Sequence, residues 1–260
     1  MMIRTVRAVV FDLGGTLVDP YSLTPLRALH NAFKKNHIYL TTHDINRYMG
    51  VCKKTHIQSL LRDYYNDIYR APAHLSDLDR KVDRIHRAFQ VEHNRLTTNN
   101  ITLLPGALDI HNFLRDKGIK IGVTTGYSIK EAEPILKHLD SQGFTVDKAV
   151  TSDMVKLSRP YPGMMFEVMK GLEIECLDAS SVLKVDDSIS GLDEGRRSGS
   201  ITVGLAKYSS MMGPFALQAT ANGPYLHTKI QSVKDKMIEN CTDYVLDDLH
   251  DLHNILQTEV

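Results

Sequence analysis

The pattern of apolar and polar positions divides the chain into two regions of different character. Residues 6–11 form a short apolar run that is typical of a buried strand and ends directly at Asp12. Between residues 24 and 98 the apolar positions recur at helical spacing, and no strand pattern is convincing. This segment predicts a helical insert of about 75 residues.

One stripe within this insert is especially regular, and it consists of Leu78, Val82, Ile85 and Phe89. Such spacing predicts one buried helix face, in the core or in a dimer contact. Ser76 and Asp79 resemble a capping box at the start of that helix.

After residue 100 the strand and helix patterns alternate. Strands are expected at residues 119–124, 149–151, 182–185, 201–205 and 244–246. Ser128 and Glu131 predict a capped helix start, and residues 160–172 predict a helix with proline in its first turn. This alternation predicts an α/β fold, a parallel sheet with helices on both faces. We expect a core of residues 1–19 plus 101–260 and a helical cap of residues 20–100.

Composition limits the class of protein. The chain has 260 residues, 42% hydrophobic and 24% charged, as in an ordinary soluble globular protein. Its 31 basic and 31 acidic residues balance, which disfavours nucleic acid as a partner. No apolar run approaches the ~20 residues of a membrane span, and no signal-peptide pattern occurs. Three cysteines without a CxxC pair favour a reducing compartment, so a cytoplasmic location is expected.

Four short motifs fall where the predicted strands end or a helix begins. They are Asp12-Leu-Gly-Gly-Thr, Thr-Thr-Gly-Tyr127, Arg159-Pro-Tyr-Pro and Asp186-Asp187-Ser. In this order they resemble the signatures of the haloacid dehalogenase superfamily. The resemblance implies a Rossmann-like core with an inserted all-α cap, and Asp12 as a nucleophile.

A motif in the helical insert narrows this resemblance. Met49-Gly-Val-Cys-Lys53-Lys-Thr-His56 resembles the cap motif of the phosphonatase family, and the similarity extends over nearly the whole chain. It implies hydrolysis of phosphonoacetaldehyde to acetaldehyde and phosphate, through an imine on Lys53 and an aspartyl phosphate on Asp12. It also implies a homodimer joined through the cap, and it places Met49 and Tyr127 near the substrate.

The residue types fit phosphoryl chemistry. A carboxylate such as Asp12 can attack phosphorus, provided that a cation screens it from an anionic substrate. Mg²⁺ prefers oxygen ligands, and Asp187 at a neighbouring strand end can supply a second carboxylate. The resemblance adds the backbone carbonyl of Gly14. The remaining phosphoryl oxygens can be bound by Thr125, the Gly126 amide and Arg159, and the resemblance adds Gly15 and Ser22 to the substrate site.

Gly14 departs informatively from the superfamily pattern, because phosphatase members carry a second Asp at that position. The missing acid would protonate a leaving alkoxide. A phosphonate has carbon as its leaving atom instead, and an iminium on Lys53 would accept the electrons. The absence of the acid and the presence of the lysine therefore explain each other.

Lys53 must be neutral to attack an aldehyde, whereas the pKa of a free lysine is ~10.4. Burial and a neighbouring cation lower this pKa, and Lys54 and His56 are candidate neighbours. His56 lies three residues after Lys53 on the same helix face and is a candidate proton shuttle. Asp186 is expected to support the metal site from behind.

Four positions differ from the phosphonatase family. Ser22 replaces Cys, Ser158 replaces Gly, Gly163 replaces Trp, and Gly191 stands where some members carry a second acid of the metal motif. The alternatives are a phosphatase or phosphomutase, a phosphonatase-like hydrolase with another substrate, and a non-catalytic phosphate-binding protein. Zinc is not expected, because the histidines lack metal-ligand spacing.

Overall fold

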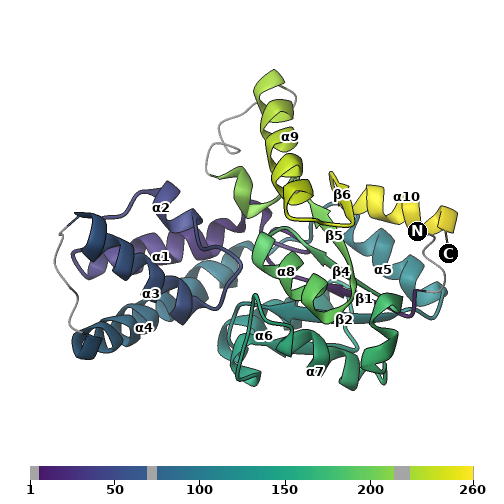
Figure 1. Ribbon diagram of the computed structural model, residues 1–260, viewed down its shortest axis with the longest axis horizontal. Coiled ribbons are helices and arrows are strands. Elements are labelled where there is room, and N and C mark those ends of the chain that lie inside the picture. The colour runs from purple at the N-terminus through teal and green to yellow at the C-terminus, as the bar shows by residue number, and fades with distance from the viewer. Residues whose placement is uncertain (1–5, 69–74, 214–222, 260) are drawn as a thin grey trace.

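The computed structural model describes residues 6–68, 75–213 and 223–259. One parallel sheet has the strand order β3-β2-β1-β4-β5-β6 (Figure 1). Its strands are β1 (Ala8–Phe11), β2 (Lys120–Thr125), β3 (Lys148–Thr151), β4 (Val182–Asp186), β5 (Ile201–Leu205) and β6 (Tyr244–Leu246). Every strand predicted from the sequence is present, with ends that differ by two residues at most. Since β1 lies between β2 and β4, Asp12 lies between the ends of its neighbours.

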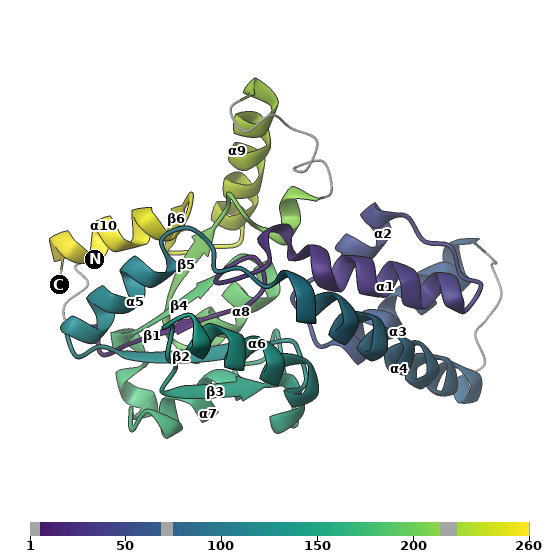
Figure 2. The ribbon, with the colours of Figure 1, turned by 180° about the vertical axis from the view of Figure 1, so that it is seen from behind.

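Helices cover both faces of the sheet, as the alternating pattern predicts. Val9 and Phe11 of β1 pack in the cluster that holds α5 (Ala107–Asp116), α6 (Ile129–Ser141) and α10 (Leu249–Glu259). Ala8 and Val10 point the other way and pack with α7 (Gly163–Gly171). Figures 1 and 2 show these two layers from opposite sides. The same views place α8 (Ile189–Ser198) in the α7 layer, and α9 (Pro224–Glu239) packs near β5 and β6.

Helices are the regular elements of the insert between β1 and α5 in its described residues. It contains α1 (Leu23–Lys35), α2 (Thr42–Asn46), α3 (Lys53–Asp63) and α4 (Leu75–Asn100), with a π-helical turn η2 (Tyr64–Ile68). These helices form a separate bundle beside the sheet (Figures 1 and 2). Leu78, Val82, Ile85 and Phe89 are all buried within this chain. The stripe is therefore internal core, which corrects the dimer-contact alternative.

Two connections join the bundle to the sheet region, and they meet at one point. Val18 on the first connection forms bridges with Gly14 and with Leu103 on the second. The short helical turn η1 (Pro20–Ser22) follows, and Asp19, Tyr21 and Ser22 all have left-handed φ angles, of 52°, 64° and 49°. Left-handed backbone is costly for residues other than glycine. Both connections pass through this point; the domain bounds themselves stay a prediction.

Two predicted helix starts are wrong. Ser76 lies inside α4, which already includes Leu75, so Ser76 is not the cap. Helix α7 begins at Gly163, not at Pro160, because Pro162 occupies the N-cap. Ser128 does lie at the N-cap of α6, where its N–H donates to the Glu131 carboxylate over 2.8 Å.

The remaining short helical turns are η3 (Ser152–Met154), η4 (Cys176–Ser181) and η5 (Ser210–Met212). No helix in the described ranges combines the length and apolar character needed to cross a bilayer.

Candidate active site

Three buried carboxylates gather at the ends of β1 and β4. Asp12 follows β1, Asp186 ends β4, and Asp187 comes next. One oxygen of each lies within 4.8 Å of the others. The two strands are parallel neighbours with Phe11 paired to Val185, so the segments that follow them leave the sheet at the same edge. The predicted pairing of Asp12 with Asp187 is thus realised in space, and Asp186 joins the group.

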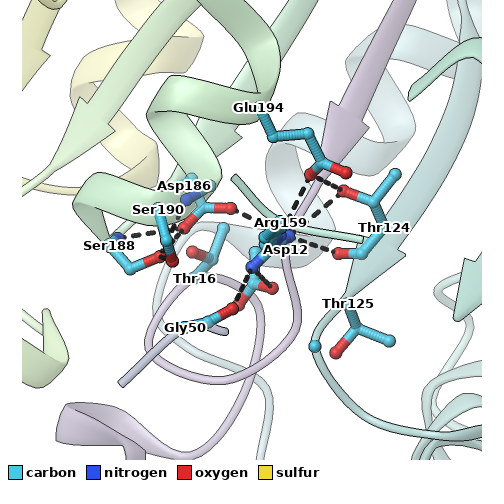
Figure 3. Close-up of polar contacts among 12 residues, drawn as sticks. Asp12, Thr16, Gly50, Thr124, Thr125, Arg159, Asp186, Ser188, Ser190 and Glu194 are labelled. Atoms are coloured by element: carbon cyan, nitrogen blue, oxygen red, sulfur yellow. Dashed lines mark hydrogen bonds and ion pairs between the residues drawn. The ribbon is translucent and has the colours of Figure 1, made fainter. Parts of the chain in front are cut away.

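Arg159 links these carboxylates through three different nitrogens. Nη1 lies 2.9 Å from Asp12 Oδ1, Nη2 lies 3.1 Å from Asp186 Oδ2, and Nε lies 3.0 Å from Glu194 Oε2. Figure 3 shows the guanidinium at the centre of this arrangement, with the cap backbone at Gly50 beside it. Arg159 is only 4% exposed, so these ion pairs are shielded from solvent.

Sequence reasoning missed two members of this network, Lys184 and Glu194. Lys184 Nζ lies 3.0 Å from Asp186 Oδ2 and donates to the Thr124 hydroxyl over 2.7 Å. Thr124 in turn donates to Glu194 over 2.9 Å. A lysine inside an apolar strand was the available signal, because a buried lysine requires partners. No comparable local signal marks Glu194.

Burial and the neighbouring charges shape the pKa values of the carboxylates. Burial and the Asp186 charge raise the pKa of Asp12 to about 6, although Arg159 opposes this. Burial, Asp186 and Asp12 raise the pKa of Asp187 well above its usual range. Burial would also raise the pKa of Asp186, but Arg159 and Lys184 outweigh it and lower that pKa.

This charge balance fits a divalent cation. Asp12, Asp186, Asp187 and Glu194 surround only two paired cations, Arg159 and Lys184, which leaves two negative charges when all are ionised. An oxygen-rich site of this kind suits Mg²⁺. Asp12 and Asp187 would be its carboxylate ligands, and Gly14 lines the same cavity.

Glycine and backbone contacts hold Asp187 in place. The Ser210 N–H donates to Asp187 Oδ2 over 2.7 Å. Gly15 has a φ of +82°, and a Cβ at that position would lie 2.6 Å from the same carboxylate oxygen. Gly15 therefore lets the loop after β1 approach Asp187 closely.

A cavity of about 30 Å³ lies between the carboxylates and the cap. Ten of the twelve predicted site residues line it: Asp12, Gly14, Ser22, Met49, Lys53, Thr125, Gly126, Tyr127, Arg159 and Asp187. Gly15 and His56 do not. This is room for about two water molecules, so a larger substrate would require the cap to move.

Lys53 is the first residue of α3 and is 5% exposed. Its Nζ lies 5.3 Å from the centre of the Tyr127 ring, and it has no hydrogen-bond or ion-pair partner among the described residues. Burial lowers the pKa of Lys53; Glu131, Asp12 and Cys52 oppose the shift, and Arg159 reinforces it. The start of a helix also disfavours a positive charge. This lysine is therefore biased toward the neutral, nucleophilic form.

The cation that reinforces this bias is Arg159. Of the two candidate neighbours, Lys54 lies elsewhere, an outcome that its position on the helix left open. Lys54 points away from the cavity and pairs with Asp83 over 2.8 Å at the surface.

His56 is completely buried one turn after Lys53. Its Nε2 lies 2.7 Å from the Ile45 carbonyl oxygen, and its Nδ1 has no partner among the described residues. Burial and the Lys53 charge lower its pKa to about 3, so the ring is neutral near pH 7. Its proposed proton-shuttle role stays a prediction.

Two of the four positions that differ from the phosphonatase pattern have a structural reason. A Cβ at Gly163 would lie 2.5 Å from the Leu157 carbonyl oxygen, and a Cβ at Gly191 would lie 2.0 Å from Asp186 Oδ2. Neither position accepts a side chain in this arrangement. Ser22, in contrast, lines the cavity and faces Gly14, whose added Cβ would lie 3.1 Å from the Ser22 Oγ.

Comparisons with known proteins agree with this geometry. The profile of the haloacid dehalogenase-like hydrolases matches residues 6–199. Phosphonoacetaldehyde hydrolases from Bacillus cereus (strain AH187) and Bacillus mycoides (strain KBAB4) are both 28% identical, over 97% of this chain and 96% of theirs.

Solved structures have the same fold. A phosphonoacetaldehyde hydrolase-like protein from Oleispira antarctica is 26% identical with a TM-score of 0.88, over 99% of this chain and 94% of that one. A β-phosphoglucomutase from Clostridium difficile shares the fold at 17% identity and a TM-score of 0.66, over 98% and 97%. Since the profile covers most of the chain and the carboxylates stand at the expected strand ends, this chain belongs to the haloacid dehalogenase-like hydrolases.

Proposed function

We propose that this hydrolase cleaves the carbon–phosphorus bond of phosphonoacetaldehyde to give acetaldehyde and phosphate. One observation carries the proposal: Lys53, a buried lysine without an ion-pair or hydrogen-bond partner among the described residues, lines the same cavity as the Asp12 carboxylate. A phosphatase has no use for such an amine. The names of the bacterial relatives support the same substrate.

The two residues would act in sequence on one substrate. Neutral Lys53 adds to the aldehyde carbonyl and water leaves, which gives a protonated imine. Asp12 then attacks phosphorus, and the electrons of the broken P–C bond pass into the iminium to form an enamine. Protonation at carbon and hydrolysis release acetaldehyde from Lys53. Water finally hydrolyses the aspartyl phosphate on Asp12 and releases phosphate.

The surrounding residues support the phosphoryl half of this reaction. Arg159 and the Thr125 and Gly126 region line the cavity beside Asp12, where they can bind phosphoryl oxygens. Mg²⁺, bound by Asp12, Asp187 and the Gly14 carbonyl, would neutralise charge as the phosphoryl group is transferred.

Gly14 explains why oxygen is disfavoured as the leaving atom. It stands where an acid would protonate an alkoxide, and the cavity wall next to it is formed by Ser22 and Tyr127, which are not strong acids.

Turnover of paired substrates tests the proposal. With Mg²⁺ present, phosphonoacetaldehyde should release phosphate and acetaldehyde in equal amounts, and faster than p-nitrophenyl phosphate releases phosphate. Lys53→Ala should lose phosphonate cleavage by about a thousandfold, since its covalent route is removed. Lys54→Ala, the matched control, should retain it. Faster hydrolysis of the phosphate ester, or an active Lys53→Ala, would replace this proposal with a phosphatase or phosphomutase.

A further inference from the structure

Lys53 lines two cavities. Besides the small cavity at Asp12, it lines a second cavity of about 610 Å³. Helices α3 and α4 of the cap form one wall of this second cavity, and the start of α6 and the turn η3 form the other. Its lining includes one fully buried carboxylate, Glu131, which is 1% exposed.

Glu131 is held from both sides of the cap boundary. Its Oε2 accepts from the Ser128 N–H over 2.8 Å, which fixes it to the sheet region. Its Oε1 lies 3.4 Å from Nε2 of His86 on α4 of the cap, and it has no hydrogen bond from another described group. Burial would raise the pKa of Glu131, but His86 and the Ser128 N–H outweigh burial and lower that pKa. Glu131 therefore places a negative charge in the second cavity that Lys53 lines.

We propose that Glu131 is the counterion of the iminium on Lys53 and keeps this imine protonated while the carbon–phosphorus bond breaks. This inference rests on the proposed function and adds a positioning residue to it. Glu131 acts through Lys53 and not on the substrate directly.

The reaction itself creates the need for such a charge. Only a positively charged imine accepts the electrons of the breaking bond, and burial disfavours that charge. Asp12 also favours a cation at Lys53, but its carboxylate is consumed when it attacks phosphorus. Arg159 disfavours the cation. Glu131 is the carboxylate near Lys53 that stays ionised through the reaction.

Groups from several elements contribute to the electrostatics of this pair. Lys53 interacts with Glu131 of α6, Asp12 after β1, Arg159 before α7, and Cys52 and His56 of its own helix region, with the ring of Tyr127 and with His93 of α4. Glu131 interacts with His86 and His93 of α4 and with Lys53.

Trapping with the reaction product tests the counterion without any phosphonate. The protein is incubated with acetaldehyde and cyanoborohydride, which reduces protonated imines, and ethylation of Lys53 is measured against pH by peptide mass spectrometry. The acid limb of this profile reports deprotonation of the amine, and the alkaline limb reports deprotonation of the imine. Glu131→Gln removes the charge and keeps an oxygen for the Ser128 N–H.

Both limbs should move to lower pH in Glu131→Gln. On the alkaline limb the labelling rate should fall by roughly threefold or more, which is the effect of half a pKa unit. Glu131→Asp keeps the charge and should restore the limbs toward wild type. Asp83→Asn is the matched control, because Asp83 lines the same cavity but pairs with Lys54, and its profile should match wild type.

Unmoved limbs in Glu131→Gln, or equal shifts in Asp83→Asn, would overturn the inference. If Glu131→Gln does not fold, Glu131→Met, which has a similar length and no charge, is read in the same way. A separate result would contradict the proposed function, namely no turnover of phosphonoacetaldehyde by the wild-type protein. The trapping profile can be measured whether or not that turnover occurs.

Discussion

The sheet side and the cap side of the cavity differ in how their charged groups are paired. On the sheet side, Arg159 and Lys184 pair with Asp12, Asp186 and Glu194, and nearly every charge has a partner within hydrogen-bonding distance. On the cap side, the charge of Lys53 has no such partner among the described residues, and Glu131 acts on it only from a distance.

The difference separates binding from reactivity. Dense pairing fixes charges and gives a rigid site for an anion. An unpaired buried amine is poorly stabilised as a cation, and this makes it nucleophilic. The sheet side thus accounts for what this hydrolase shares with its superfamily, and the cap side accounts for the proposed attack on an aldehyde.

The largest expected effect comes from removing the centre of the paired side. Arg159→Leu leaves three buried carboxylates without their shared cation, so the free energy of unfolding should fall by about 3–5 kcal/mol. Phosphoryl transfer should be lost as well. Urea unfolding and phosphate release measure the two effects.

Arg159→Lys serves as the control, because it keeps the charge but cannot reach all three carboxylates. It should recover part of the stability and little of the activity. A stable Arg159→Leu protein would show that the paired network is not required.

Acidification should affect the two sides in opposite directions. His56 has a folded pKa of about 3 against an ordinary value of 6.5, so the unfolded state binds more protons and stability falls as the pH drops below 6.5. Asp12 has a folded pKa of about 6 against 3.8, so its contribution rises as the pH falls toward 4. The His56 share between pH 6.5 and pH 5 is about 2 kcal/mol.

The difference in unfolding free energy between wild type and His56→Gln isolates this share. The advantage of wild type should shrink by about 2 kcal/mol over that pH interval. Parallel stability curves for the two proteins would mean that His56 is not held neutral by burial.

A smaller effect is expected from giving the cavity the acid that it lacks. A side chain at Gly14 would lie 3.1 Å from Ser22 Oγ, a contact that a small shift relieves. Gly14→Asp should raise hydrolysis of an alkyl phosphate such as glycerol 2-phosphate, whose leaving alkoxide needs a proton, by roughly tenfold, below the usual contribution of a positioned acid. Gly14→Asn provides the uncharged control, and equal rates in both variants would contradict the role assigned to the missing acid.

Local patterns were sufficient to predict the strands and the residues at their ends. A short apolar run followed by Asp12 predicts a buried strand with a carboxylate at its end, and parallel pairing with β4 does bring Asp187 to the same edge. The start of α7 was misplaced because Pro160 resembles a first-turn proline, whereas the helix begins after Pro162.

Long-range pairing was not predictable in the same way. Glu194 and Glu131 contact groups on other elements, and one sequence gives no local signal for such contacts. Glu131 was correctly predicted as a capping residue, but its interaction with Lys53 was not predicted. The partner of Lys54 was not predictable either, since Asp83 lies on another helix.

Borohydride trapping with phosphonoacetaldehyde tests most directly whether Lys53 and Asp12 act on one substrate. In the presence of Mg²⁺, reduction should inactivate the wild-type protein only when substrate is present, and peptide mass spectrometry should find the two-carbon adduct on Lys53. In Asp12→Asn the adduct should retain its phosphonate group, because the imine forms but the carbon–phosphorus bond stays intact. An adduct on another lysine, or a dephosphonylated adduct in Asp12→Asn, would contradict the account.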